Sequence, residues 1–380
     1  MKRAFLFLLI IFLVLPLVYC NSNVENNNNS NSHNPSNNTA ISFVQSEQTL
    51  GDTRSFGLAI ADIDLDGDMD ILFANYVGPS PLWLNDGNGN FTLHPQIFGT
   101  GVESTHDVDI ADLNGDTYPD IFVANHDEPS KIYFNNGDGS FTESSQLIGS
   151  VGENPQTIQL ADVDGDGDMD AYLYNISAPN RIWINDGTGH FVMRNVDYGG
   201  STSHKQWLAD FNGDSFPDLY ISYRNFVPAE IWMNDGAGNF INSNQALGQG
   251  GTAVDFGDVD GDGDTDIIMG NMDITIWLNQ NNTGTFIQGS TIDEKATRTL
   301  LFDADLDGDL DLATVTSESG NRLWINDGSG NFTFHGTIFG TARMFSIGAA
   351  KLDGGDDYDI VVGGMNDSVG NLVFFNHTTP

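Results

Sequence analysis

The chain has 380 residues, of which 13 are Lys or Arg and 53 are Asp or Glu, and its formal net charge at pH 7 is -40. This charge excludes nucleic acids and anionic membrane surfaces as electrostatic partners. Hydrophobic residues make up 39% of the chain, enough for a sizeable core, so the acidity belongs to a folded protein and not to a disordered tail. The single cysteine excludes a disulfide scaffold and a Cys-rich zinc site, which leaves oxygen ligands as the expected metal chemistry.

Residues 1–20 are typical of a secretory signal peptide, because basic residues precede an apolar run, residues 4–18, that is short for a membrane span. Cys20 ends this run where the acylated cysteine of a bacterial lipoprotein would lie, so we expect lipidation there. Ordinary signal cleavage is the alternative, because Tyr19 is bulkier than the residue a lipobox prefers. Residues 21–40 contain ten Asn and four Ser, which predicts a flexible tether. We therefore expect an exported protein, either a cell-surface lipoprotein or a secreted one.

A nine-residue acidic pattern recurs along the rest of the chain at intervals of 45–50 residues. Its six copies begin at Asp62, Asp112, Asp162, Asp210, Asp258 and Asp303. A degenerate seventh copy begins at Lys351, in a similar setting of apolar segments. Self-similarity at this period indicates a repeat architecture of seven units.

Each unit predicts four short strands, which in the first unit cover residues 58–61, 71–75, 82–84 and 91–94. The acidic loop joins the first two strands, and an Asn-Asp-Gly turn between the last two indicates a hairpin because Gly supplies the positive φ. One large aromatic residue precedes this turn in every unit: Trp83, Tyr133, Trp183, Trp232, Trp277, Trp324 and Phe374. Such regularity predicts packing between units, with ligand stacking as the alternative.

Seven units of four antiparallel strands, without helical periodicity, predict an all-β fold, a seven-bladed β-propeller over residues 41–380. Residues 41–44 match a fourth strand and residues 372–376 match a third. We therefore expect the N- and C-terminal strands to share one blade and close the ring. An open solenoid is the alternative, but it needs capping repeats, and none is seen.

The acidic loops predict calcium sites, because they place carboxylate or amide oxygens at positions 1, 3, 5 and 9. Position 7 varies, as expected where only the backbone carbonyl is a ligand. Two carboxylates ~4 Å apart repel by ~1 kcal/mol even in water, and calcium accepts looser geometry than magnesium, so we expect about six bound Ca²⁺ ions. The predicted metal-site residues are Asp62, Asp64, Asp66, Asp68, Asp70, Asp112, Asn114, Asp116, Tyr118, Asp120, Asp162, Asp164, Asp166, Asp168, Asp170, Asp210, Asn212, Asp214, Phe216, Asp218, Asp258, Asp260, Asp262, Asp264, Asp266, Asp303, Asp305, Asp307, Asp309 and Asp311.

Three loops depart from the pattern. Thr117 and Ser215 replace Gly at position 6 of the second and fourth loops. In the seventh loop Lys351 takes position 1 and Gly355 takes position 5, so we expect no calcium ion there. The hypothesis for this loop is that the Lys351 ammonium neutralises the remaining carboxylates, such as that of Asp353.

The units resemble FG-GAP or VCBS-type repeats, the calcium-binding blades of integrin alpha-subunit propellers and of many bacterial exported proteins. The resemblance covers residues 41–380 and rests on the D-x-[DN]-x-D-x-x-x-D loop before an apolar strand and on the N-D-G-x-G-x-F hairpin. Only Phe56-Gly57 matches part of the Phe-Gly and Gly-Ala-Pro signature of the animal proteins, so the bacterial branch is the closer likeness. Fungal seven-bladed lectins are similar too. The resemblance implies a calcium-stabilised scaffold for adhesion or glycan binding.

The loops on the face away from the acidic loops are the less repetitive, which predicts recognition by this face, with drift in solvated loops as the alternative. The candidate partner-binding residues there are Tyr76, His126, Arg224 and Phe226. We expect the partner to be an extracellular protein or a glycan.

Catalysis is the alternative function, as a polysaccharide lyase or hydrolase on a propeller scaffold. The sequence lacks the G-x-S-x-G, H-E-x-x-H and phosphate-loop motifs, and we predict no catalytic residue. His106, Asp107 and Asp109 would be the acid–base cluster of such an enzyme, but polar residues lining a propeller channel explain them more simply.

Overall fold

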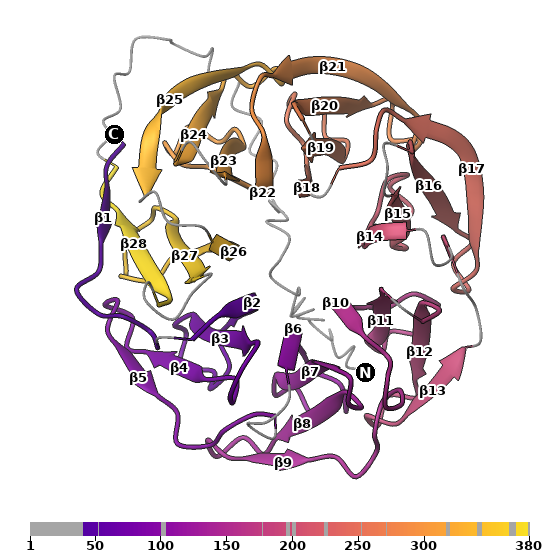
Figure 1. The fold of residues 1–380 in the computed structure, drawn as a ribbon, viewed down its shortest axis with the longest axis vertical. Coiled ribbons are helices and arrows are strands. Elements are labelled where there is room, and N and C mark those ends of the chain that lie inside the picture. The colour runs from indigo at the N-terminus through magenta and orange to yellow at the C-terminus, as the bar shows by residue number, and fades with distance from the viewer. Residues whose placement is uncertain are drawn as a thin grey trace, which may run out of the picture.

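The computed structural model describes residues 41–378, except residues 52, 100–103, 177, 195–197, 200–202, 224–226, 252, 271, 317–319, 340–343 and 365–369. The described chain forms seven four-stranded antiparallel sheets arranged in a ring (Figure 1). The predicted seven-bladed β-propeller is confirmed. Over these residues, no helix has the length and apolar character needed to cross a membrane.

The strands of each blade follow one another from the central channel to the rim (Figure 1). The innermost strands are β2 (Ser55–Ala61), β6 (Ser104–Ala111), β10 (Pro155–Ala161), β14 (Ser203–Ala209), β18 (Ala253–Gly257), β22 (Ala296–Phe302) and β26 (Met344–Ala350). The second strands are β3 (Asp70–Asn75), β7 (Asp120–His126), β11 (Asp170–Asn175), β15 (Asp218–Tyr223), β19 (Asp266–Gly270), β23 (Asp311–Thr316) and β27 (Asp359–Gly364). The third strands are β4 (Leu82–Asn85), β8 (Lys131–Asn135), β12 (Arg181–Asn185), β16 (Ala229–Asn234), β20 (Ile274–Asn279), β24 (Asn321–Asn326) and β28 (Leu372–Asn376). The outermost strands are β5 (Phe91–Leu93), β9 (Phe141–Glu143), β13 (Phe191–Arg194), β17 (Phe240–Leu247), β21 (Phe286–Ile292), β25 (Phe332–Phe339) and β1 (Phe43–Gln45).

Blade seven differs from the others in its connectivity. Blades one to six, from β2–β5 to β22–β25, each contain four consecutive strands, whereas blade seven has the order β26, β27, β28 and β1. Strand β1 pairs antiparallel with β28, so that Phe43 lies opposite Asn376 and Gln45 lies opposite Phe374. The predicted closure of the ring by the two terminal strands is confirmed.

Seven hydrophobic clusters lie between neighbouring blades, one at each interface. The cluster between blades one and two joins Leu72 and Leu82 to Val108 and Ile121, and it includes Tyr133. Every cluster likewise includes, or packs against, one of the aromatic residues that precede the hairpins. The predicted packing role of these aromatic residues is therefore confirmed.

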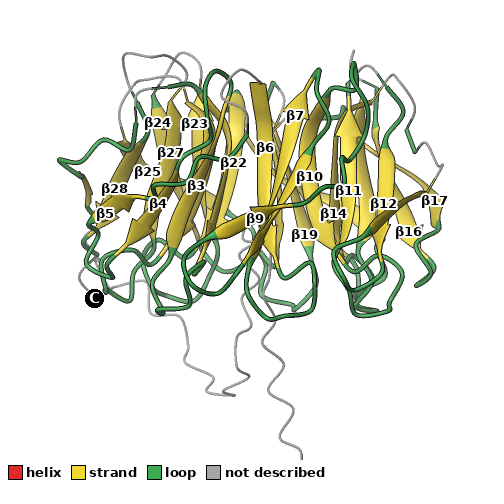
Figure 2. Cartoon of the chain, turned by 90° about the horizontal axis from the view of Figure 1, so that it is seen from below, coloured by secondary structure: helices red, strands yellow, loops and turns green. Residues whose placement is uncertain are grey.

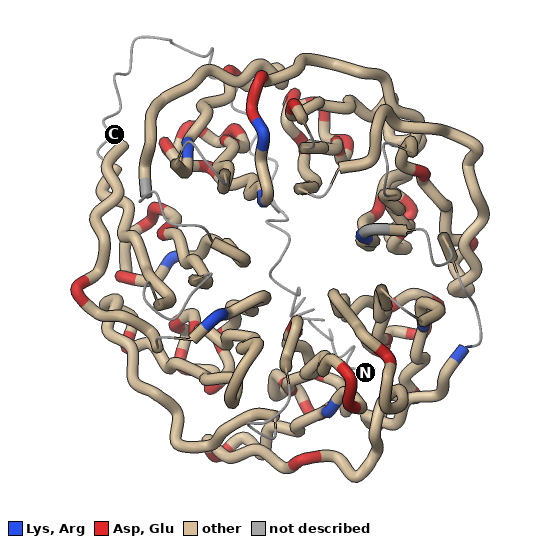
Figure 3. The backbone as a smooth tube through the Cα atoms, viewed as in Figure 1, with Lys and Arg blue, Asp and Glu red and all other residues tan. Residues whose placement is uncertain are grey.

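The propeller has two unlike faces, which appear as the upper and lower edges of Figure 2. The acidic loops and the hairpins lie together on one face, here called the acidic face, because each joins strand ends on that side. The loops between second and third strands and the connections between blades lie on the opposite face. Figure 3 shows Asp and Glu recurring from blade to blade, whereas Lys and Arg are sparse.

Candidate functional site

The six acidic loops share a backbone conformation that the aspartate at position 1 holds in place. One oxygen of this carboxylate accepts the N–H of position 6, over 3.1 Å from Gly67 to Asp62 and 2.7 Å from Thr117 to Asp112. The other four pairs are Gly167 with Asp162, Ser215 with Asp210, Gly263 with Asp258, and Gly308 with Asp303. Position 6 has a positive φ in all six loops, 100° at Gly67 and 76° at Thr117. Loops two and four therefore adopt the left-handed conformation without glycine.

Four of the loops bring three carboxylates close enough to share one cation, with candidate ligand oxygens within 4.8 Å of one another. The groups are Asp62, Asp64 and Asp66; Asp162, Asp164 and Asp170; Asp258, Asp260 and Asp262; and Asp303, Asp305 and Asp311. Each group has one buried oxygen without a hydrogen-bond partner in the described chain, namely Oδ1 of Asp62, Asp164, Asp260 and Asp305. An unsatisfied buried acceptor costs about 1–3 kcal/mol, and a divalent cation would satisfy it.

The electrostatics of these loops agree with their geometry. Burial, followed by repulsion from Asp66, raises the pKa of Asp64 above its ordinary value. Burial and repulsion from Asp307 likewise raise the pKa of Asp305 to about 6. Both shifts arise because negative charge is crowded and partly removed from water, and a bound cation would reverse them. The residues of these loops therefore fit the predicted calcium ion.

Loops two and four carry an amide at position 3 and are partly satisfied within themselves. Asn114 Oδ1 accepts the N–H of Asp116 at 2.9 Å. Asn212 Nδ2 donates to Asp214 Oδ2 at 3.0 Å, so the amide supplies a donor that an aspartate lacks. The geometric case for a cation is therefore strongest in loops one, three, five and six.

The aspartate at position 9 has a structural role that the sequence interpretation missed. In blade three, Asp170 Oδ2 accepts the N–H of Val163 at 3.0 Å and Oδ1 accepts the N–H of Asn185 at 2.8 Å. The side chain of Asn185 then donates to the carbonyl of Leu113 in the preceding blade at 2.8 Å. These three hydrogen bonds, here called the Asp–Asn clamp, join the loop, the hairpin and the neighbouring blade.

The Asp–Asn clamp recurs in all seven blades. Its aspartates are Asp70, Asp120, Asp170, Asp218, Asp266, Asp311 and Asp359, and its asparagines are Asn85, Asn135, Asn185, Asn234, Asn279, Asn326 and Asn376. The sequence did contain a signal for it, because the asparagine occurs in every unit, including those without Asp-Gly after it. The sequence predicts only a turn role for this asparagine, and its contact with the neighbouring blade was therefore not predicted.

In blades one, two, three, four and six, the side chain at position 7 is directed at a hairpin glycine of its own blade, whereas in blade five Asp264 accepts the N–H of Asn282. A β-carbon added to Gly187 would lie 2.5 Å from Asp168 Oδ2, and one added to Gly137 would lie 2.3 Å from the Tyr118 ring. This packing explains why charged and aromatic residues are both tolerated at position 7. It also leaves the backbone carbonyl as the group that this position can offer to a cation.

The seventh loop does not match the hypothesis for Lys351. Its ammonium lies over the ring of Tyr358, 5.5 Å from the centroid, and it takes part in none of the ion pairs of the described residues. The acidic side chains bond to the backbone instead: Asp353 accepts the N–H of Gly355 at 3.0 Å, and Asp357 accepts that of Thr378 at 3.2 Å. Neutralisation by Lys351 therefore has no support from the ion pairs of the described residues, and backbone donors bond to Asp353 and Asp357 instead.

On the opposite face, the predicted residues Tyr76 and His126 belong to one aromatic cluster at the mouth of the central channel. Phe56 stacks on Tyr76, with ring centroids 4.7 Å apart, and contacts Phe345 at 4.4 Å. His106 contacts Phe56 at 5.0 Å and stacks on His126 at 4.8 Å. We call these five residues the mouth cluster, and they come from blades one, two and seven. The sequence did not indicate Phe56, His106 or Phe345 as partners of the predicted pair.

Three other predicted residues, Cys20, Arg224 and Phe226, lie outside the described residues. Two members of the acid–base cluster considered above, Asp107 and Asp109, connect neighbouring blades of the propeller. Asp107 Oδ2 accepts the N–H of Ile158 at 3.1 Å, and Asp109 Oδ2 accepts that of Leu160 at 2.9 Å, so both carboxylates join β6 to β10. This arrangement favours a structural role for them over catalysis.

Comparison with known proteins agrees with the fold. A sequence model of FG-GAP-like repeats matches residues 62–123, 112–173, 162–221 and 210–269, and no curated protein sequence matches the chain significantly. A lectin from Agrocybe aegerita, solved to explain recognition of non-reducing terminal N-acetylglucosamine, is 20% identical, with a TM-score of 0.57 over 86% of this chain and 87% of the lectin.

Two further structures are similar in fold. The BP39L lectin from Burkholderia pseudomallei is 11% identical, with a TM-score of 0.62 over 85% of this chain and 98% of the lectin. BBS1N, solved in complex with ARL6DN, is 11% identical, with a TM-score of 0.61 over 89% of this chain and 97% of that one. These likenesses concern the fold alone, whereas the repeat matches cover residues 62–269, more than half of the chain. The protein therefore belongs to the family of FG-GAP-like repeat proteins.

Proposed function

We propose that this protein is a calcium-stabilised binding module that holds a protein or a glycan outside the cell on the face opposite the acidic loops. The observation that carries the proposal is the division of the propeller into two faces. The acidic face has buried carboxylate oxygens without partners, and the opposite face has the mouth cluster.

Calcium would act as a structural cross-link in this proposal. In loop three, the carboxylates of Asp162, Asp164, Asp166 and Asp170 and the carbonyl of Asp168 would hold the ion, and loops one, five and six offer the same set. Loops two and four would use the oxygens of Asn114 and Asn212 at position 3, as predicted from the sequence. The ion supplies positive charge where the chain crowds negative charge, which stabilises the folded state in proportion to RT ln(1 + [Ca²⁺]/Kd).

The mouth cluster is suited to recognition because its outer members are half-buried. Tyr76 and His126 keep part of their surface exposed while their rings are held by Phe56 and His106. Rigid aromatic side chains lose little entropy on binding, and they dominate binding hot spots. The lectin-like neighbours and the BBS1N complex are consistent with either a glycan or a protein as the partner.

Export is proposed from the sequence of the first 40 residues. The signal-like segment and the Asn-rich tether fit a module held away from a membrane, with Cys20 as the site of a lipid anchor. Mass spectrometry of the protein purified from cells would test this. A diacylglyceryl mass on Cys20 supports the anchor, and an unmodified chain starting after the signal supports secretion.

A binding array of glycans and extracellular proteins tests recognition. The parent protein is compared with the double variant Tyr76→Ala/His126→Ala and with a control, His190→Ala/Phe334→Ala, which removes a histidine and an aromatic ring that are exposed elsewhere. We expect the double variant Tyr76→Ala/His126→Ala to bind the ligand that the parent retains on the array at least about tenfold more weakly than the parent does. The control variant should bind this ligand with the affinity of the parent.

Equal binding by both folded variants would contradict the assignment of this face. Release of product from a polysaccharide by the purified parent protein would instead favour the lyase or hydrolase alternative.

A further inference from the structure

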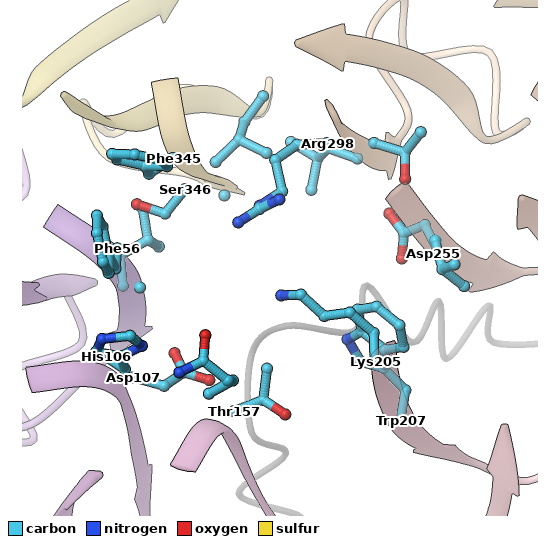
Figure 4. A pocket seen from close by; sticks show the side chains of 18 of the residues that line it. Phe56, His106, Asp107, Thr157, Lys205, Trp207, Asp255, Arg298, Phe345 and Ser346 are labelled. Atoms are coloured by element: carbon cyan, nitrogen blue, oxygen red, sulfur yellow. The ribbon is translucent and has the colours of Figure 1, made fainter. Parts of the chain in front are cut away.

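The central channel contains a polar site that neither the metal loops nor the mouth cluster explains. Its cavity of about 280 Å³ is lined by residues of all seven innermost strands. Lys205 from β14 and Arg298 from β22 both point toward its centre, with Asp107 and Asp255 on the walls (Figure 4). In a chain with only 13 Lys and Arg residues, two basic side chains thus converge inside one cavity.

Neither of these cations is paired with a carboxylate of the described chain. Among the described residues, the ion pairs of Lys and Arg join Lys131 to Glu143 and Arg322 to Glu294. Arg298 Nη1 donates to the carbonyl of Thr297 at 2.8 Å, which leaves most of the guanidinium donors available. Lys205 Nζ lies 5.5 Å from the ring centroid of Trp207. Both residues are half-buried, and a cation partly removed from water without an ion-pair partner is costly, so this arrangement favours an anionic occupant.

The two carboxylates on the wall are already engaged by the backbone. Asp107 Oδ2 accepts the N–H of Ile158 at 3.1 Å, and Asp255 Oδ2 accepts that of Leu301 at 2.6 Å. Burial raises the pKa of Asp255 to about 7 and also raises that of Asp107, so both carry less than a full negative charge near neutral pH. Burial also lowers the pKa of Lys205 to about 7 and lowers that of Arg298, and attraction to Asp107 opposes both shifts, so Asp107 compensates part of the positive charge.

We propose that the channel binds a small carboxylate between the Arg298 guanidinium and the Lys205 ammonium, and that this ligand enters past the mouth cluster. The planar guanidinium fork matches a carboxylate. A monoanion suits the cavity better than a phosphate dianion because Asp107 and Asp255 share the same walls. The volume lies near the lower limit of about 300 Å³ for small-molecule sites, which fits an acidic monosaccharide or a similar organic acid.

Calorimetric titration of the whole exported protein with D-glucuronate tests the site, with D-glucose as the neutral probe and inorganic phosphate as the dianion. We expect saturable binding of glucuronate and at least about tenfold weaker binding of both other probes. Arg298→Gln and Lys205→Met should each weaken glucuronate binding about tenfold or more. Lys351→Met, which removes a cation from the acidic face, should leave binding unchanged.

Substitutions in the channel can also change the stability of the fold. A second measurement is therefore made on the parent protein, without any substitution. NMR contacts between labelled glucuronate and the Trp207 indole are expected in the parent protein. No saturable glucuronate binding, equal affinity in the folded channel variants, or an absence of contacts to Trp207 would each overturn the site. Phosphate binding as tight as that of glucuronate would overturn the carboxylate assignment. The outcome of this titration is independent of the binding array that tests the proposed function. Free glucuronate is a small ligand for the channel and does not require a protein or glycan bound at the opposite face.

Discussion

Blade seven shares the Asp–Asn clamp with the other six blades but differs from them in its acidic loop. The Asp–Asn clamp is present in blade seven, where Asp359 accepts the N–H of Leu352 and that of Asn376, both at 2.8 Å. The loop before it is different, because Lys351 at position 1 cannot accept the N–H of position 6. Asp356 at that position is accordingly not among the described residues with positive φ.

This difference separates two roles that the nine-residue pattern combines. The aspartate at position 9 is retained where the carboxylates of positions 1 and 5 are lost, so its role in holding the blades does not need a cation. The carboxylate or amide oxygens at positions 1, 3 and 5, together with the left-handed turn at position 6, go with the proposed calcium site, to which the aspartate at position 9 also contributes. Blade seven is thus an internal control for the metal loops of the other six blades.

The largest effect should come from breaking the closure of blade seven. Deleting residues 41–50 removes β1, the buried Leu50 and the two hydrogen bonds between Gln48 and Phe91, of 2.6 and 3.0 Å. It also exposes the edge of β28. We expect a loss of most of the folding stability and rapid cleavage in limited proteolysis. Deleting residues 21–40 should change neither, and equal resistance of the two truncations would count against a closed ring.

The next effect is loss of the Asp–Asn clamp in the same blade. Asp359→Ala leaves the buried N–H groups of Leu352 and Asn376 without acceptors, at about 1–3 kcal/mol each, so the free energy of unfolding should fall by about 2–5 kcal/mol. Urea denaturation measures the change, and we expect the same loss with and without a calcium chelator. Asp356→Ala, at an exposed position of the same loop, is the control, with a change of at most about 0.5 kcal/mol. A loss seen only in the presence of calcium would contradict a metal-independent clamp.

The sequence predicted the fold well because its repeats carry the information for the blades in local form. Each unit shows its strands, its hairpin and the aromatic residue that packs between blades, and residues 41–44 and 372–376 supplied the incomplete seventh blade. The first strand of the first unit was predicted to start at residue 58 but starts at Ser55. This residue donates from Oγ to Asn75 across the strand pair, a contact that a hydrophobic pattern does not reveal.

The site was harder to predict because its parts come from different blades. Asn185 looks like a turn residue until Leu113 of the preceding blade is seen to accept its side-chain hydrogen bond. The convergence of Lys205 and Arg298 is invisible in the sequence, since 93 residues separate them and only ring closure brings them to one cavity. Spacing within a repeat predicts local ligands, whereas contacts around the ring need the structure.

Neutralising one metal loop should have a smaller effect, confined to calcium-containing buffer. Asp162→Asn/Asp164→Asn/Asp166→Asn should reduce the calcium bound per chain by one. At free calcium one hundred times above Kd, it should also lower the free energy of unfolding by about 2.7 kcal/mol relative to the parent. Calorimetry and elemental analysis, with and without chelator, give both quantities. For the parent we expect chelation to lower the melting temperature by several degrees.

The matched change in blade seven is Asp353→Asn/Asp356→Asn, which should alter neither the calcium content nor the response to chelator. If the parent contains no calcium and melts identically with chelator, the calcium proposal fails, while the role of the Asp–Asn clamp stands.

The smallest effect concerns the left-handed turn itself. Thr117 has a φ of 76°, where a β-branched side chain costs about 1–2 kcal/mol, so Thr117→Gly should stabilise the protein by about 1 kcal/mol after the entropy of glycine is counted. The reverse change, Gly167→Thr, should destabilise it by a similar amount through strain alone, because a β-carbon at Gly167 would meet no atom within 4 Å. Asp356→Gly, without a left-handed residue to relieve, should gain nothing. Urea denaturation in the presence of a chelator measures these changes in the free energy of unfolding without a contribution from metal binding. If Asp356→Gly stabilises the protein as much as Thr117→Gly does, the turn at position 6 does not distinguish the metal loops from the seventh loop.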